Sequence, residues 1–465
     1  MQELTSRGVK KFRGFKGVFF LLMVLSVLPV SCHSRRSSRK DKVLPAAWMP
    51  APKEHVATGT VQKITVAGDS SQSYAVYLPP HYDDSLQWPA VYFFDPHAAG
   101  ALPVKKYSVW AGEHGYILFG SNNLKNRMSS EEMNRYLRSF FDDTYRRFSL
   151  DEHRITVAGF SGGARVASTV ALTDPSIRGV IACGGGLPGM RSMPQIRFDF
   201  LLFAGNEDFN LPELLDLDRA LQSQSCRHYL IRFDGKHAWP DSLIFENAFF
   251  WLDFNAMRDG LLPGNDSLVR LFENNLLARL RRLPRSALRE REALLSRLVT
   301  FLQDLAPVEK YKQQLSTLHN SPSWRKYQQE QAALLRKEKE QQQIYLRAFS
   351  GKSLTWWTGA LGKLRQEIKE TGGEEKNYRL RLLHFLSLAA YMQADAALRQ
   401  HREAEAEKYV AIYKLADPEN PYVYYFQAVL AARKGEREKT QVLLRKALDM
   451  GFEKERVGDF LEDKR

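Results

Sequence analysis

The sequence predicts an α/β fold, in which a parallel sheet is covered by helices, followed by a region built from helices alone. Two observations predict it. Over residues 56–258, short β-rich segments alternate with helix-length amphipathic segments, as in βαβ units with parallel strands. After Gly260 the β-rich segments stop, and Leu, Arg, Gln and Glu recur at helical spacing. The length of 465 residues favours two or three folded units over one.

Eight segments are expected as strands. One of them, Ala90–Phe94, is apolar throughout, which is typical of a strand buried on both faces. The expected strands are Val56–Val66, Ser73–Leu78, Ala90–Phe94, Tyr116–Phe119, Arg154–Ala158, Gly179–Cys183, Phe198–Ala204 and His228–Phe233. The expected helices between and after them are Glu131–Phe148, Gly162–Leu172, Leu211–Gln222 and Ser242–Met257.

The N-terminus reads as an export signal. Basic residues precede an apolar run, Gly17–Val30, which is shorter than the roughly 20 residues that a membrane-spanning helix needs. The following Leu28–Cys32 resembles the lipobox of bacterial lipoproteins, although Pro29 stands where the common pattern has Leu. The resemblance implies that residues 1–31 are removed, that Cys32 is lipidated, and that the protein is exported and anchored to a cell-envelope membrane. An ordinary cleaved signal peptide and an uncleaved anchor are the alternatives.

The net charge of +14 does not indicate a nucleic-acid partner. Residues 1–42 hold ten Lys and Arg against two acidic residues, so much of the excess lies in the export signal and in the polar linker over 32–55 that follows it. The linker could also lie against anionic lipid headgroups. The remaining chain is only mildly basic, and its 44% hydrophobic content is that of a globular protein.

The helical part is expected as a connector over 264–370 and a repeat region over 376–465. Residues 422–448 resemble one tetratricopeptide (TPR) unit, with small residues at Ala428 and Ala447 for close helix contact and Gly435 at the turn. Leu382–Pro418 resembles a preceding unit, and Thr440 departs from the pattern, which usually has Ala there. The resemblance implies a surface for a protein partner; a generic helical bundle is the alternative.

The motif that carries chemistry is Gly159–Gly163, which matches G-x-S-x-G. It follows the expected strand Arg154–Ala158 and opens a helix, and this context is the one that a nucleophile elbow requires. Ser161 would lie on a tight strand-to-helix turn, where the flanking glycines leave room. Without that context, a structural Gly-Ser turn would explain the motif as well.

A serine hydroxyl needs a base to become a nucleophile, and the base needs a carboxylate to orient it. After the strand Phe198–Ala204, the loop offers Asp208, with Glu207 as the alternative acid. After the strand His228–Phe233, the loop offers His237. The three residue types each follow a strand end, and the carboxyl ends of parallel strands meet at one edge of a sheet. The sequence therefore predicts a catalytic triad of Ser161, Asp208 and His237.

These motifs over residues 56–258 resemble the α/β-hydrolase superfamily, and the G-x-H-x-W-P string at Gly235–Pro240 resembles the histidine loop of polyester depolymerases and related esterases of the dienelactone-hydrolase type. The resemblance implies an acyl-enzyme on Ser161 and an oxyanion site formed by the amides of Gly162 and Ala98. Many relatives have a His-Gly pair in the second loop, which this chain lacks, so the second donor stays open.

Several further expectations follow from the residues. The segment between Cys183 and Phe198 is too short for an inserted lid, so an open site is expected. Trp239, Phe209 and Leu187 could line it, although packing is the plainer role for each. No metal or cofactor is expected, because no ligand cluster is visible. Cys183 and Cys226 fall at opposite ends of the expected sheet, which disfavours a disulfide between them.

The sequence therefore predicts an exported, membrane-tethered esterase acting on a small or polymeric ester. Two alternatives remain open: a peptidase with the same triad, and a protein-binding lipoprotein in which the helical repeats act and the hydrolase part is a non-catalytic scaffold.

Overall fold

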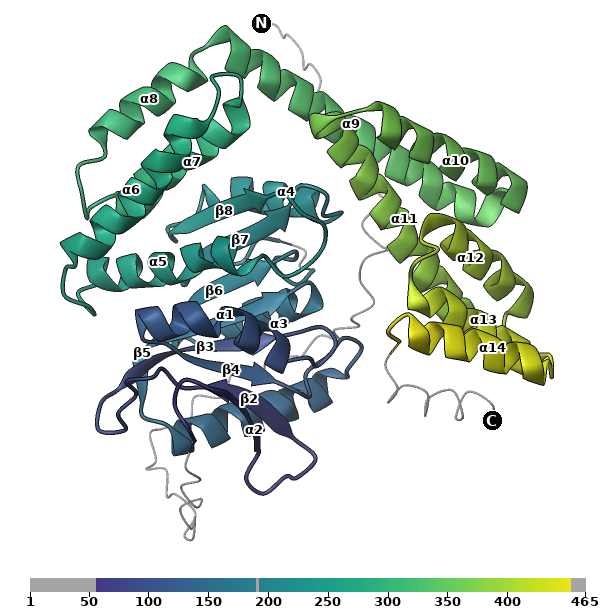
Figure 1. Ribbon diagram of the computed structural model, residues 1–465, viewed down its shortest axis with the longest axis horizontal. Helices are drawn as coiled ribbons and strands as arrows, with labels where there is room; N and C mark the ends of the chain where they lie inside the picture. The colour runs from purple at the N-terminus through teal and green to yellow at the C-terminus, as the bar shows by residue number, and fades with distance from the viewer. Residues whose placement is uncertain (1–55, 190–191, 453–465) are drawn as a thin grey trace, which may run out of the picture.

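The computed structural model describes residues 56–189 and 192–452. A sheet occupies the first half of the chain, and helices make up the rest (Figure 1). The strands are β1 (Val61–Thr65), β2 (Ser73–Tyr77), β3 (Trp88–Phe94), β4 (Ile117–Ser121), β5 (Leu150–Phe160), β6 (Ile177–Cys183), β7 (Asp199–Gly205) and β8 (His228–Phe233). Their order across the sheet is β1-β2-β4-β3-β5-β6-β7-β8.

The sheet is antiparallel at one edge and parallel elsewhere. β2 pairs antiparallel with both β1 and β4, whereas every pair from β4 to β8 is parallel. The carboxyl ends of six strands therefore lie along one edge, where loops gather residues that are distant in sequence. This strand order, with helices on the crossovers except the one from β6 to β7, defines an α/β-hydrolase type of sheet.

Helices cover both faces of the sheet. One hydrophobic cluster joins a sheet face to α1 (Ala101–His114) and α5 (Ser242–Arg258). The other face packs against α2 (Ser130–Arg147), α3 (Gly162–Thr173) and α4 (Leu211–Leu221). The central strands β3 and β4 are buried along their whole length, as expected for strands with helices on both sides.

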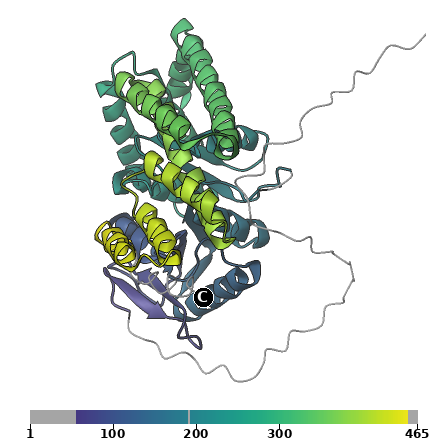
Figure 2. The ribbon, with the colours of Figure 1, turned by 90° about the vertical axis from the view of Figure 1, so that its right-hand side faces the viewer.

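The helices that follow fall into two groups. The first group extends the cluster around α5: α6 (Asp266–Arg282), α7 (Leu288–Leu302) and α8 (Glu309–His319). The second builds a separate hydrophobic cluster. Its members are α9 (Pro322–Gly351), α10 (Leu354–Glu370), α11 (Gly373–Arg399), α12 (Glu403–Ala416), α13 (Pro421–Arg433) and α14 (Arg437–Asp449). Figure 2 shows this second group in front of the sheet when the molecule is viewed from its right-hand side.

The predicted fold class is confirmed: a largely parallel sheet with helical layers precedes an all-helical region. Strand β8 has the predicted limits, whereas β1 begins at Val61 rather than Val56. The helix α1 was not predicted. It contains Pro103 and Gly112, and its apolar residues form no clear stripe, so neither periodicity nor propensity indicated it.

In the helical region, α11 with α12 and α13 with α14 form successive helical hairpins. Ala428 and Ala447 are fully buried where α13 and α14 meet, and Gly435 has a positive φ of 77° in their connection. Cys32, the expected linker and the expected export signal lie outside the described residues. Among the described helices, none combines the length and the apolar content needed to cross a bilayer.

The turn between β5 and α3 depends on a close approach of main chains. A Cβ on Gly159 would overlap the carbonyl of Gly163, and a Cβ on Gly163 would overlap the carbonyl oxygen of Phe94 on β3. Both obstacles are backbone atoms of buried elements, which cannot rotate away. Glycine at these positions is therefore a requirement of the fold.

We predict that Gly163→Ala lowers the free energy of unfolding by about 3 kcal/mol or more, because β3 and α3 must separate to admit the methyl group. Gly359→Ala is the matched control: Gly359 lies inside α10 with open space around it, so alanine there should stabilise by about 0.5–1 kcal/mol. Urea denaturation measures both. Equal effects of the two substitutions would contradict the packing account.

Candidate active site

Three polar side chains meet beyond the carboxyl ends of parallel strands. Ser161 follows β5 directly, Asp208 lies three residues beyond β7, and His237 lies four residues beyond β8. The imidazole Nδ1 of His237 is 2.9 Å from Asp208 Oδ1, and its Nε2 is 2.9 Å from Ser161 Oγ. Both distances are in the hydrogen-bond range, so the three groups form one continuous chain.

Ser161 has a backbone conformation that L-residues rarely adopt, with φ 54° and ψ −116°. The strain is held by the packing of β5 and α3 and by the amide of Ser161, which donates to the Cys183 carbonyl at 2.8 Å. The turn raises the hydroxyl above the sheet edge, and the N-terminus of α3 lies directly behind it. A helix N-terminus favours negative charge that develops nearby.

Of the two acids that the sequence left open, Asp208 is the one that contacts His237. Its side chain is 1% exposed, and Oδ1 also accepts a 2.8 Å hydrogen bond from the amide of Asn210. Two donors on one buried oxygen hold the carboxylate in position against the imidazole. Glu207 instead contributes its main-chain atoms, with its amide donating to the Gly235 carbonyl at 2.9 Å.

A run of glycines after β6 makes room for this chain. A Cβ on Gly184, which has φ 59°, would come within 2.9 Å of Asp208 Oδ2 and 3.0 Å of His237 Nδ1. A Cβ on Gly185 would lie 2.5 Å from the Ser161 carbonyl oxygen. These two positions were not predicted from the sequence, although three consecutive glycines at a strand end are a signal of close backbone approach.

Aromatic rings enclose the imidazole. The rings of Phe209 and Phe160 lie 4.3 and 4.6 Å from that of His237, measured between centroids. Trp239 is 7% exposed, and its indole donates a 2.8 Å hydrogen bond to Asp95 Oδ2. Trp239 therefore packs between the histidine loop and the loop after β3, which is the packing role expected from the sequence as the plainer one.

Asp95 anchors that second loop. Burial acts to raise the pKa of its carboxyl, but hydrogen bonds from His97 and the Trp239 indole lower it, so the group is ionised at neutral pH. Asp95 Oδ1 also accepts a 2.9 Å bond from the His97 amide.

The proposed oxyanion donors differ in their availability. The amide of Gly162 opens α3, where the first N–H groups have no intrahelical acceptor. Ala98 has φ 61°, and its amide donates to the Asp95 carbonyl at 3.1 Å. The turn therefore already uses the Ala98 amide, and the structure corrects the expectation that it is free to bind an oxyanion.

Asn126 is a polar group at this position that the sequence did not indicate. It follows β4, and its amide donates to the Pro96 carbonyl at 2.9 Å, which ties its loop to the loop after β3. Its carboxamide lies directly against Gly162, so closely that a Cβ on Gly162 would overlap it. Oδ1 is the atom of Asn126 nearest to that Cβ position, and Nδ2 would lie 3.1 Å from it.

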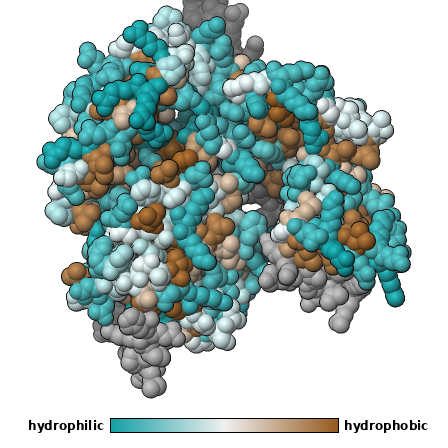
Figure 3. All heavy atoms as spheres, in the orientation of Figure 1, coloured by the Kyte–Doolittle hydropathy of each residue, from teal (hydrophilic) through white to brown (hydrophobic). Residues whose placement is uncertain are grey.

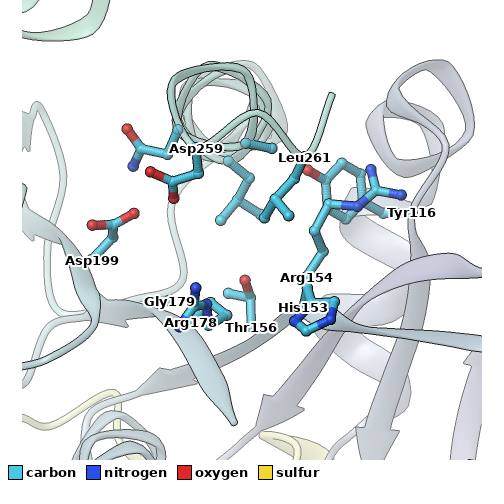
Figure 4. Close-up of a pocket in the computed structure, with 12 residues that line it drawn as sticks. Tyr116, His153, Arg154, Thr156, Arg178, Gly179, Asp199, Asp259 and Leu261 are labelled. Carbon is cyan, nitrogen blue, oxygen red and sulfur yellow. The ribbon is translucent and has the colours of Figure 1, made fainter. Parts of the chain in front are cut away.

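Two cavities of the described structure lie away from these residues. One of about 40 Å³ lies toward the amino ends of β5, β6 and β7, among Thr156, Gly179 and Asp199 (Figure 4). Arg227 bridges Asp199 and Asp259 there, with hydrogen bonds of 2.7–2.9 Å. A larger cavity of about 770 Å³ runs beside the edge strand β8 and α7. Neither is lined by the serine, the histidine or the buried aspartate.

Within residues 56–189 and 192–452, no group of His, Cys, Asp and Glu side chains is arranged to hold a metal ion. Cys183 and Cys226 are free thiols, and burial raises the pKa of both. Both thiols are therefore poor nucleophiles at neutral pH.

Comparison with known proteins gives likeness at the level of solved structures. No protein-family model matches the chain, and no curated relative matches it. An S-formylglutathione hydrolase from Staphylococcus aureus aligns at 14% identity over 42% of this chain and 98% of its own, with a TM-score of 0.35. One from Agrobacterium tumefaciens aligns at 18% identity over 41% and 93%, with a TM-score of 0.33. A ferulic acid esterase aligns at 14% identity over 41% and 93%, with a TM-score of 0.34.

We predict that Trp239→Phe lowers the free energy of unfolding by about 1.5–3 kcal/mol at neutral pH, because it removes a donor to a buried carboxylate. Since the pKa of Asp95 is lowered, this contribution is present above pH 3.8 and is lost as the pH falls through the lowered value. Trp110→Phe is the control, since its indole donates at 2.8 Å to a neutral hydroxyl, that of Ser242, and should cost about 0.5–1.5 kcal/mol. Urea denaturation that gives the two variants equal losses would contradict the assignment.

Proposed function

We propose that this protein is a serine hydrolase that cleaves carboxylic esters through an acyl-enzyme on Ser161. The observation that carries the proposal is the continuous hydrogen-bonded chain from Ser161 through His237 to the buried Asp208, with the serine on a strained strand-to-helix turn. A serine held this way beside an imidazole has the base that it needs to attack an acyl carbonyl.

The mechanism follows from these positions. His237 Nε2 takes the proton of Ser161 Oγ as the oxygen attacks the carbonyl carbon, and Asp208 stabilises the imidazolium that forms. When the tetrahedral intermediate collapses, the imidazolium gives that proton to the leaving oxygen. A water molecule then attacks the acyl-enzyme with His237 as base, which releases the acid and restores the serine.

The negative oxygen of each tetrahedral intermediate needs hydrogen-bond donors. We infer that the Gly162 amide is one donor and that the carboxamide of Asn126 supplies the other, because the carboxamide lies directly against Gly162, the residue after the nucleophile. The oxygen and nitrogen of a carboxamide exchange places on rotation, so Nδ2 can face the oxyanion when substrate binds.

We also propose that the chain is exported and held at a membrane by lipid on Cys32, because basic residues, an apolar run and a lipobox-like sequence precede that cysteine. Support for a TPR-like role of α11–α14 comes from the paired helices and from buried alanines at Ala428 and Ala447, positions where that repeat has small residues. A protein partner would bind there.

Ser161→Ala should abolish hydrolysis of p-nitrophenyl acetate, and Asp208→Asn should lower kcat about 10³–10⁴-fold because the imidazole loses its orientation and its counter-charge. The release of p-nitrophenol measures both. Ser139→Ala, on the exposed side of α2, is the matched control and should keep the wild-type rate. Full activity of Ser161→Ala would rule out the proposed nucleophile.

Asn126→Ala should lower kcat about 10²-fold with a small effect on KM, because an oxyanion donor acts mainly in the transition state. The alanine keeps the main-chain bond to Pro96, so the loop stays in place. Asn122→Ala is the control: its side chain donates to Ser73 Oγ at 3.3 Å in the same loop, and its kcat should stay within about twofold of wild type. If Asn126→Ala behaves like this control, the second donor is a different group.

A further inference from the structure

Helix α11 lies against the loop that carries the candidate catalytic acid. Arg381 Nη1 donates a 2.7 Å hydrogen bond to the carbonyl of Asn206, and His384 Nδ1 lies 3.0 Å from the carbonyl oxygen of Glu207. These two carbonyls immediately precede Asp208 in the chain. The C-terminal helices therefore contact the loop that carries Asp208, although they are far from it in sequence.

The contact that Arg381 makes with the acid loop is buried. The Arg381 guanidinium pairs with both oxygens of Glu338 on α9 at 2.7–3.1 Å, and the two side chains are 4% and 0% exposed. Phe209 packs against the hydrophobic cluster of α9–α14 while its ring lies 4.3 Å from that of His237. A buried ion pair and an aromatic side chain that contacts both the helical cluster and His237 hold α11 against the site.

The same helix contacts the loop on the other side of the nucleophile. Asp395 Oδ2 lies 3.0 Å from Arg127 Nη1, and the Arg127 guanidinium lies over the ring of Tyr391 at 5.4 Å. Arg127 follows Asn126, whose carboxamide touches Gly162. Helix α11 therefore spans the distance from the acid side of Ser161 to its oxyanion side, which is about 16 Å along the helix from His384 to Asp395.

Two apolar side chains occupy the helix face between these anchors. Leu388 lies one turn after His384, and Met392 lies one turn further and one turn before Asp395, so all four share one stripe. Leu388 and Met392 are half-buried, and of the hydrophobic clusters among the described residues none includes them. Their neighbours Leu383 and Tyr391, by contrast, pack against the helical cluster.

The geometry of the triad determines which part of a bound ester would contact Leu388 and Met392. The leaving oxygen must lie next to His237 Nε2 to receive its proton, so the acyl chain extends away from that imidazole. The oxyanion takes the side of Gly162 and Asn126, so the acyl chain leaves in a third direction. Helix α11 extends between the acid loop and Arg127, and Leu388 and Met392 lie on it between these two contacts. In Figure 1, α11 runs beside the edge toward which the parallel strands point, and Figure 3 shows a hollow between the sheet-bearing part and the helical lobe on the right.

We propose that α11 is the wall of the acyl-binding cleft and that Leu388 and Met392 set the length of acyl chain that the enzyme accepts. The proposal rests on the ester hydrolysis proposed above. It gives the helical region a part in substrate selection. The segment between β6 and β7 is too short for a lid, and α11 would cover the site instead. The cleft would then accept apolar acyl chains, because the wall between its two anchors is apolar.

The test compares kcat/KM for p-nitrophenyl acetate, butyrate and octanoate, using the full chain. Leu388→Trp should lower the octanoate-to-acetate ratio at least tenfold by filling the cleft, and Leu388→Ala should raise it severalfold. Met392→Trp provides a second obstruction if Leu388→Trp fails to fold. Val442→Trp places the same ring on an exposed position of α14, 68% exposed, and should leave the ratio at its wild-type value.

Two results would overturn the proposal in distinguishable ways. If the wild-type protein hydrolyses these esters but its chain-length ratio is the same in the folded Leu388 and Met392 variants, α11 does not line the acyl cleft and the proposed hydrolase function stands. If the wild-type protein neither hydrolyses any ester of the series nor reacts with a fluorophosphonate, the hydrolase function fails and this proposal fails with it.

Discussion

The strained backbone at Ser161 is the constraint on which the rest of the site depends. Its positive φ exists only because β5, β3 and α3 approach so closely that Gly159 and Gly163 admit no side chain. That approach needs strands buried on both faces and a helix packed directly on them, which the two hydrophobic clusters of the sheet provide. The packing of these two clusters therefore stabilises Ser161 in a backbone conformation that this residue would not adopt alone.

The parts of the fold that the sequence predicted share a local cause. Continuous apolar runs such as Ala90–Phe94 indicate buried strands, and Ser161, Asp208 and His237 each follow such a strand end, so parallel pairing alone brings them to one edge. Helix α1 was missed because its composition carries little periodicity. The strands were predicted more accurately than their ends: β1 is shorter than predicted and β5 is longer.

The parts of the site that the sequence could not predict depend on distant contacts. Asn126 reaches Gly162 because its loop is tied to Pro96, and the Ala98 amide is already used by its own turn. The contact of α11 with the acid loop joins residues about 175 positions apart, through Arg381 and the carbonyl of Asn206. No local sequence pattern indicates such a contact. The expectation of an open site rested only on the short segment between β6 and β7.

The sheet and the helical region are thus joined at the place where chemistry is proposed. The buried pair of Arg381 and Glu338 has no role in the triad itself, yet it fixes the carbonyl two residues before Asp208. Removing one partner of a buried ion pair costs about 3–5 kcal/mol, because the other charge stays buried. The helical region therefore stabilises the acid loop as well as its own core.

The most direct test of the central claim is reaction of the purified protein with a fluorophosphonate, followed by mass spectrometry of its peptides. The account predicts one stoichiometric adduct, on Ser161, and no adduct when His237 is replaced by alanine, since the hydroxyl then lacks its base. An adduct on another serine, or none on a protein whose folding is shown by a cooperative thermal transition, would contradict it.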